Sequence, residues 1–390
     1  MNIGLLGSDW RMAEVVSAAM RRGDRVVAAW GAGDDHPARI ASWESLLDPA
    51  TCQLVLVGSD DWDQSRAEAV RALVQTGRPL VLSQPLELSM LWAYELDMIR
   101  RDTGGLLIPC LPDRLHPFVG RLREALAGDG EQGAAESLLL ERRMQDRSRP
   151  AVLAQLSRDA DLIRAIAGDP TRLSTLGSAL PESAWNTLAV GFTGPTQLPV
   201  RWQVAPGEAP GLTLRLQTAR GAVVVDAPDA ALRPWTWTAG ATDTAIFDRG
   251  AAMLGVIDRH LAGTSAPADV PEAATWADAA RAIELAETVP RSLTRGRAID
   301  LHREEFSEMG TFRGTMASLG CGLIMAALMV VVIATLVAGI AQEFGWKMLG
   351  SLADSWPAIV LAVLGLFLVL QLLPLFVGGD RGAGGTNGET

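Results

Sequence analysis

Cysteine is scarce in this sequence, and its placement excludes the roles in which cysteine most often appears. Only three cysteines occur among 390 residues, at Cys52, Cys110 and Cys321, and none belongs to a CxxC pair. An odd number at such spacing rules out a disulfide framework and gives no metal-binding pattern. We therefore expect buried free thiols in a reducing compartment.

Basic clusters are missing as well. The formal net charge is −11 and the pI is about 5.0, and no run of arginines is interleaved with aromatic residues. These absences exclude nucleic acid as the expected partner. Charge at Asp9 and Arg11 precedes any long apolar run, so no signal peptide is expected. The chain also contains no internal repeat.

Two long stretches toward the C-terminus carry no charge. Residues 314–342 and 355–378 are apolar, and each exceeds the ~20 residues that span a bilayer. Trp346 and Trp356 lie at a common end of the two stretches, where interfacial tryptophans are favoured. Arginines precede the first stretch at positions 291, 295, 297, 303 and 313. We predict a hairpin in the cytoplasmic membrane with the N-terminal part facing the cytoplasm, the alternative being two buried core helices.

Before this predicted hairpin, the pattern of predicted helices and strands changes once along the chain. Up to about residue 117, short apolar strands alternate with helices, which predicts a parallel α/β sheet. The strands are expected at 2–7, 25–30, 53–58, 79–83 and 106–110, and the helices at 11–22, 63–76 and 88–101.

The following part reads as an α+β domain with a mainly antiparallel sheet. Its helices are expected at 117–127, 151–167, 244–261 and 273–288, and its strands at 136–144, 172–178, 186–192, 200–204, 212–218 and 222–225. The expected organisation is a Rossmann-like, doubly wound domain (1–117), an α+β domain (118–298), a juxtamembrane linker (299–313), transmembrane helices (314–342 and 355–378), an external loop (343–354) and a disordered tail (379–390).

The turn after the first strand departs from the pattern that binds dinucleotides. In Gly-x-Gly-x-x-Gly, small residues let the pyrophosphate approach the helix N-terminus. Gly7 fits the first position, but Asp9 and Met12 stand at the other two. A carboxylate there caps the free N–H groups itself and repels phosphate. The turn therefore predicts a nucleotide-type fold with a compromised cofactor site.

Four segments in order resemble the Gfo/Idh/MocA family of glucose–fructose oxidoreductases and inositol dehydrogenases. They are Ile3–Gly7, Gly77–Leu86, Asp161–Pro170 and Trp276–Leu285, the last followed by Arg295-Gly296-Arg297. The resemblance covers about residues 1–305 and implies a Rossmann domain followed by an α+β domain. It also implies hydride transfer between NAD(P) and a sugar or cyclitol hydroxyl.

The family's catalytic positions carry different residues here. The lysine of its Glu-Lys-Pro motif corresponds to Gln84, and its Asp and His correspond to Ala154 and Arg158. None of these side chains acts as a general base. The acidic residue that holds the ribose in NAD-dependent members corresponds to Gly31, unless Asp34 or Asp35 folds back.

For several other residues the sequence allows both a functional and a structural interpretation. The candidate cofactor-site residues are Gly4, Gly7, Asp9, Trp30, Ser59 and Gln84. His116 is the one remaining candidate acid/base group, the ordinary alternative being a structural histidine. Trp10, Trp30 and Trp62 each lie at or just past the end of one of the first three strands. We hypothesise that at least two of them fill the crevice that an adenine and ribose would occupy. Packing in the local core is the alternative for each.

The sequence thus predicts a membrane-anchored, degenerate oxidoreductase-like protein that serves as a binding, sensing or scaffold module. The alternatives are a working NAD(P)-dependent oxidoreductase with a rearranged site, and a structural element of a membrane complex. Its partners are expected to be the lipid bilayer, an unidentified small molecule and, by family analogy, a second copy of the chain through the second sheet.

Overall fold

The computed structural model describes residues 1–33, 36–128, 133–178, 184–207, 209–264 and 271–301, together with Met329. All of these residues except Met329 belong to one compact unit. Residues 302–313 of the predicted linker, the predicted hairpin apart from Met329, the predicted tail and Cys321 lie outside the described residues, as do Asp34 and Asp35. Residues 299 and 300, expected in the linker, instead form a short strand of the second sheet. Within the described ranges, no helix has both the length and the apolar character needed to cross a bilayer.

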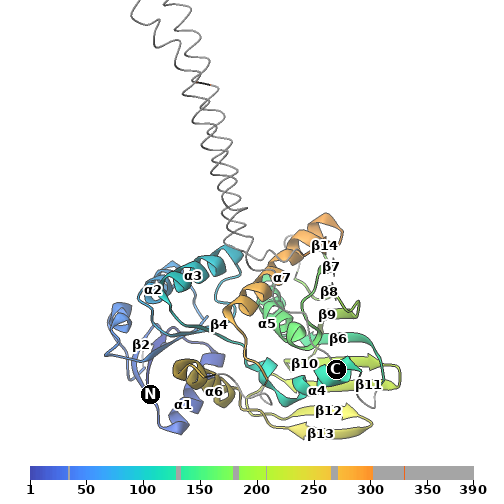
Figure 1. The fold of residues 1–390 in the computed structure, drawn as a ribbon, viewed down its shortest axis with the longest axis horizontal. Coiled ribbons are helices and arrows are strands. Elements are labelled where there is room, and N and C mark those ends of the chain that lie inside the picture. Colours follow the sequence, from blue (N-terminus) through green and yellow to red (C-terminus); the bar gives the residue numbers. More distant parts are fainter. Residues whose placement is uncertain are drawn as a thin grey trace, which may run out of the picture. The chain divides into compact units, whose positions relative to one another are not determined.

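The first sheet, of which Figure 1 labels β2 and β4, is parallel throughout, as predicted. Its strand order is β2-β1-β3-β4-β5. Short apolar strands with β-branched residues suit such a sheet because both of its faces are buried. The strands are β1 (Asn2–Leu6), β2 (Arg25–Trp30), β3 (Leu54–Val57), β4 (Leu80–Ser83) and β5 (Leu107–Cys110).

Helices cover both faces of this sheet, and two of them come from the far end of the described chain. One face packs against α1 (Trp10–Arg22) and α6 (Arg249–Ala262). The other packs against α2 (Gln64–Gln75), α3 (Met90–Thr103) and the first half of α7 (Trp276–Arg295). The first sheet therefore completes its core with helices that follow β13 in sequence, after all but the last strand of the second sheet.

The second sheet has strand order β13-β12-β11-β10-β6-β9-β8-β7-β14. Its neighbours pair antiparallel, as predicted, except for the parallel pair β6 and β9. The strands are β6 (Ala135–Arg143), β7 (Arg172–Leu176), β8 (Ala189–Thr193), β9 (Pro199–Ala205), β10 (Gly211–Thr218), β11 (Gly221–Pro228), β12 (Trp235–Ala239), β13 (Ala241–Ala245) and β14 (Ile299–Asp300).

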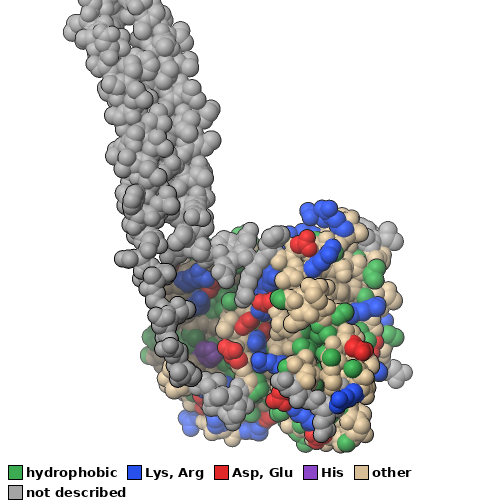
Figure 2. All heavy atoms as spheres, turned by 45° about the vertical axis from the view of Figure 1, so that its right-hand side comes forward, with side chains coloured by type: hydrophobic (Ala, Val, Ile, Leu, Met, Phe, Trp, Pro, Cys, Tyr) green, Lys and Arg blue, Asp and Glu red, His purple; other side chains and the backbone are tan. Residues whose placement is uncertain are grey.

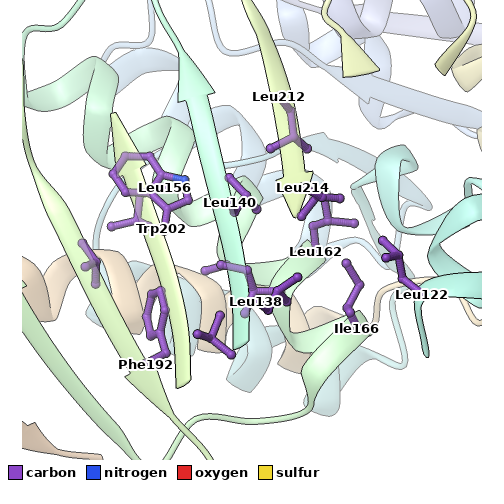
Figure 3. Close-up of a cluster of buried hydrophobic side chains, with 14 of the residues drawn as sticks. Leu122, Leu138, Leu140, Leu156, Leu162, Ile166, Phe192, Trp202, Leu212 and Leu214 are labelled. Atoms are coloured by element: carbon purple, nitrogen blue, oxygen red, sulfur yellow. The ribbon is translucent and has the colours of Figure 1, made fainter. Parts of the chain in front are cut away.

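One face of the second sheet forms the larger hydrophobic core. Side chains from α4 (Pro117–Ala127) and α5 (Arg149–Ala167) meet the inward positions of β6, β8, β9 and β10 (Figure 3). Trp202 of β9 is fully buried there. Over the face drawn in Figure 2, acidic and basic side chains are interspersed, which fits the absence of basic clusters noted in the sequence.

Two of the predicted helices have wrong bounds. The helix expected from Thr244 begins only at Arg249, because residues 241–245 form β13 and Asp248 caps the helix. Gly240, with φ +79°, makes the tight turn that joins β12 to β13. The helix expected at 273–288 begins at Trp276, where Thr275 and Asp278 form a capping box, and continues to Arg295 through Pro290.

Candidate functional site

The carboxylate of Asp9 occupies the turn between β1 and α1. Gly7 adopts φ +73°, and its N–H donates to the carbonyl of Trp30 at 2.8 Å. Asp9 then caps α1, with its Oδ1 accepting from the N–H groups of Arg11 and Met12, both at 2.9 Å. The predicted self-capping is therefore confirmed, and the N–H groups that bind a phosphate in dinucleotide folds are bonded within the chain.

The second oxygen of Asp9 joins this turn to the loop after β3. Oδ2 accepts from the N–H of Ser59 at 2.8 Å and from its hydroxyl at 3.0 Å. Burial raises the pKa of Asp9, but the hydrogen bonds from Met12 and Ser59 outweigh that effect and hold the pKa below its ordinary value. Asp9 is thus a buried anion whose two carboxylate oxygens both accept hydrogen bonds from within the chain. Ser59 donates to Asp9 rather than to an external ligand.

Arg66 reaches across the carboxyl ends of the first three strands. Its guanidinium donates to the carbonyl of Asp60, after β3, and to that of Gly31, after β2, the latter at 3.3 Å. A Cβ on Gly7 would lie 3.3 Å from Arg66 Nη1, and one on Gly31 would lie 3.0 Å from Nη2. An arginine side chain that the sequence analysis missed therefore lies against the turns after β1 and β2.

The tryptophans and Gly4 lie elsewhere than expected. Trp30 and Trp62 pack against the α2–α3 core, where Trp62 meets Trp92 edge-on at 5.7 Å. Trp10 is 44% exposed and stacks on the Arg11 guanidinium at 4.1 Å. The side chain between Gly7 and Gly31 is thus Arg66 rather than a tryptophan. Gly4 is inside β1, away from the turn, where a Cβ would crowd Leu46 at 2.8 Å.

The positions that correspond to the family's lysine and histidine are brought together. Arg158 on α5 donates from Nη1 to the carbonyl oxygen of Gln84 at 2.9 Å. Gln84, just after β4 in a cis peptide with Pro85, is buried, and its side-chain oxygen has no partner among the described residues. Ala154 lies one helical turn before Arg158 and offers no polar group. This trio holds no group that accepts a proton from a hydroxyl.

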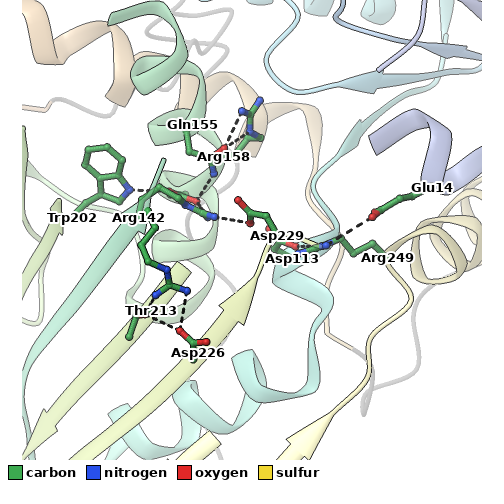
Figure 4. Close-up of polar contacts among 12 residues, drawn as sticks. Glu14, Asp113, Arg142, Gln155, Arg158, Trp202, Thr213, Asp226, Asp229 and Arg249 are labelled. Carbon is green, nitrogen blue, oxygen red and sulfur yellow. Dashed lines mark hydrogen bonds and ion pairs between the residues drawn. The ribbon is translucent and has the colours of Figure 1, made fainter. Parts of the chain in front are cut away.

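Behind Arg158 a buried ion pair connects α5 to the second sheet (Figure 4). Arg142 of β6 donates to both carboxylate oxygens of Asp159, at 2.9 Å from Nε, and Asp159 also accepts from the indole of Trp202 at 2.8 Å. Arg142 further pairs with Asp229 at 2.9 Å. Gln155 donates to Asp159 at 3.0 Å and accepts from Arg158. The network fixes the position of Arg158.

A small cleft opens between the first sheet and α5. Its volume is about 10 Å³, room for about one water molecule, and its lining is Arg11, Cys110, Leu111, Pro112, Asp113, Arg114, Arg158, Asp161 and Leu162. Burial raises the pKa of Asp161 to about 6 although Arg114 pairs with it at 2.8 Å. Burial also raises the pKa of the Cys110 thiol to about 12, so that thiol stays protonated. Asp161 is a titratable cleft residue that sequence reasoning had used only for its helix motif.

His116 is a fully buried structural residue. Its Nδ1 caps α4 by accepting from the N–H of Phe118 at 3.0 Å, and its ring stacks on Trp235 at 4.0 Å. Burial lowers its pKa to about 4. It is absent from the lining of the cleft. These surroundings suit the structural alternative and not an acid/base role.

The buried His116 predicts a pH-dependent stability. The pKa of His116 is about 4 in the folded chain and about 6.5 in the unfolded chain. Between pH 4 and pH 6.5 the unfolded chain therefore binds a proton at His116 that the folded chain does not bind. Its contribution is therefore present above pH 6.5 and is lost as the pH falls toward 4. We expect the stability of the wild type, relative to His116→Asn, to fall by about 2–3 kcal/mol over this window.

Urea unfolding of both proteins at several pH values measures this difference. Asparagine keeps an N-cap acceptor without the titrating ring, so the comparison isolates protonation. Parallel curves for the two proteins would contradict the assignment.

The remaining candidate ligands do not assemble. Among the described residues no cluster of His, Cys, Asp and Glu has the makings of a metal site. Cys52 and Cys110 are buried free thiols, as expected. His36 accepts from the N–H of Ala38 in its loop, and His260 contacts the carbonyl of Val256 within α6.

Comparison with known proteins places the fold. No protein-family model matches the sequence, and no curated protein matches it. Among solved structures, a myo-inositol dehydrogenase from Corynebacterium glutamicum has a TM-score of 0.59 at 15% identity, covering 77% of this chain and 99% of that one. An enzyme of gentamicin A biosynthesis, in complex with NAD, has a TM-score of 0.60 at 16% identity, covering 77% and 96%.

A third similar structure is an oxidoreductase from Agrobacterium radiobacter in complex with NAD⁺, L-tartaric acid and magnesium. Its TM-score is 0.59 at 13% identity, and the match covers 77% of this chain and 98% of that one. At such identities the likeness establishes the fold alone. The described part of this chain therefore has the fold of Gfo/Idh/MocA-type oxidoreductases, a parallel Rossmann-like sheet followed by a mixed second sheet.

Proposed function

We propose that this protein is a small-molecule binding module built on a dehydrogenase fold, without dinucleotide-dependent chemistry of its own. The observation that carries the proposal is the bonding of Asp9, whose buried carboxylate takes the N–H groups of Arg11, Met12 and Ser59. A pyrophosphate at this helix N-terminus would have to displace that carboxylate and then lie beside its negative charge.

The reaction centre supports the same proposal. Hydride transfer from a hydroxyl requires a base that takes the hydroxyl proton. Gln84 holds no titratable proton, Ala154 has no polar group, and Arg158 remains a cation. Arg66 adds a steric argument, since its guanidinium lies beside Gly31, the position of the ribose-binding acid in the family.

Binding of NADH and NADPH to the full-length protein tests the proposal. We expect no saturable change in nicotinamide fluorescence up to about 1 mM cofactor, which excludes dissociation constants tighter than that range. The double variant Asp9→Gly with Gln84→Lys is the matched comparison, because it restores the family's residues at both positions. Micromolar binding by the wild type would overturn the proposal.

The second candidate is an NAD(P)-dependent oxidoreductase with a rearranged site. Two observations favour it: a similar structure is an NAD complex, and Asp161 lines the cleft with a pKa of about 6. A carboxyl of that pKa is suited to proton transfer near neutral pH. Cofactor binding by the wild type, together with loss of turnover in Asp161→Asn, would support this candidate instead.

We further propose that the module is held at the cytoplasmic membrane by the two apolar stretches at 314–342 and 355–378. Their length and lack of charge are the support for this proposal. We expect the full-length protein to stay in the membrane pellet after extraction with alkaline carbonate. Release into the supernatant would contradict the anchor.

A further inference from the structure

A groove lies between α1, the start of α6 and the loop that joins β11 to β12. It is formed by residues 10–21, 247–249 and 231–232, and we call it the α1–α6 groove. It shares no lining residue with the small cleft beside α5. Its volume is about 290 Å³. Since an apolar cavity of about 150 Å³ takes a benzene ring, the α1–α6 groove has room for a ligand of one or two rings.

Much of the surface that this groove offers is apolar. Trp10 and Leu232 are 44% and 53% exposed, and Ala13 and Phe247 add further apolar surface. The guanidinium of Arg11, which is not part of the lining, lies over the Trp10 ring at 4.1 Å and limits its movement. A half-exposed indole held in this way offers a flat surface on which another ring stacks.

The charged side chains of the groove already have partners of opposite charge. Arg21 pairs with Asp248 at 2.5 Å, and Asp248 also caps α6. Arg249 bonds Asp113 at 2.8 Å and lies 3.9 Å from Glu14 (Figure 4). The lining therefore has two cations that balance two anions, and the helix N-terminus that would favour an anion is occupied. An ion gains little in such a groove.

Glu14 is a polar group of the groove with hydrogen-bonding capacity to spare. Its side chain is 18% exposed, and within the described part of the chain its carboxylate accepts no hydrogen bond. Burial raises the pKa of Glu14, which agrees with a carboxylate that has lost water without gaining a donor. Gly250 fixes this position, because a Cβ there would overlap the carbonyl of Glu14 and push α6 away from α1.

We infer that the α1–α6 groove binds a neutral aromatic compound of one or two rings that carries an N–H or O–H group. The ring of the ligand stacks on Trp10, and its N–H or O–H donates to the carboxylate of Glu14. The inference rests on the proposed binding function and deepens it, since it names the chemical class of the ligand and the place where the ligand binds.

Equilibrium dialysis of indole against the full-length protein in detergent tests the inference. Dialysis against the same detergent without protein corrects for indole in the micelles. We expect saturable binding with an apparent Kd of about 0.1 mM. The analogue 1-methylindole has the same rings but no N–H, so it makes no hydrogen bond to Glu14. It should bind about tenfold more weakly than indole.

Two variants assign the binding to this groove. Trp10→Ala removes the stacking surface and should weaken both compounds about tenfold. Glu14→Leu removes the acceptor and should weaken indole alone, so that the two compounds bind equally, while Arg249 keeps its bond to Asp113. Leu91→Ala is the matched control, because Leu91 is 80% exposed on α3 and is not part of the groove. It should leave both affinities unchanged.

Uptake of indole that does not saturate, or binding that survives unchanged in Trp10→Ala, would overturn the inference. An undiminished preference for indole in Glu14→Leu would overturn the role of Glu14. Tighter binding of tryptamine or of indole-3-acetate than of indole would overturn the neutral class. No nicotinamide is present in the dialysis, so failure here is distinguishable from failure of the proposed function, which the cofactor titration measures.

Discussion

Replacing Asp159 by alanine is expected to lower the free energy of unfolding by about 3–5 kcal/mol, the largest effect of any single change considered. The side chains of Asp159 and Arg142 are 2% and 1% exposed, so the substitution leaves a buried guanidinium with only Asp229 as an acidic partner. It also removes the acceptor of the Trp202 indole and of Gln155. Urea unfolding followed by tryptophan fluorescence measures the loss.

The matched control is Asp226→Ala. Asp226 also pairs with an arginine of β6, Arg143 at 3.0 Å, but it is about half exposed. Exposed pairs contribute little because water screens them, so a loss below about 1 kcal/mol is expected. Equal losses in the two variants would show that burial of the Arg142–Asp159 pair is not what makes it important.

Replacing Asp9 by alanine is expected to cost about 2–3 kcal/mol, more than an ordinary N-cap. The substitution removes the acceptor of Arg11, Met12 and Ser59 at once, and the N–H groups of Met12 and Ser59 are left in a largely buried turn. The cost therefore combines the loss of a cap with the loss of the connection between the turns after β1 and β3.

Asp63→Ala calibrates that cost. Asp63 caps α2 by accepting from the N–H of Arg66 alone, and it is exposed. We expect a loss of about 1 kcal/mol for Asp63→Ala in the same urea titration. If Asp9→Ala cost no more than Asp63→Ala, the bridge to Ser59 would be energetically unimportant.

Much of the fold was predictable because its signals are local. The bounds of β2 and α4 were predicted without error, since turn residues flank the one and Pro117 and Gly128 delimit the other. The β12–β13 hairpin was missed because its strands are short and its second strand is exposed. Residues 241–245 give no alternation of buried and exposed positions to distinguish them from the start of a helix.

The candidate site shows the same difference between local features, which the sequence predicts, and long-range contacts, which it does not. The cap formed by Asp9 follows from residues within one helical turn, so the sequence predicted it. Arg66, by contrast, bonds Gly31 across two strands, and Arg142 meets Asp159 only when β6 packs on α5. Such contacts between distant segments leave no periodic or spacing signal in a single sequence.

The bonds of Asp9 have a consequence for how the protein responds to the cell's metabolic state. An enzyme that binds its cofactor only when folded gains stability as the cofactor concentration rises. Here the anion at the helix N-terminus is covalently part of the chain, at an effective concentration that never changes. The folded population is therefore expected to be indifferent to the nicotinamide pool.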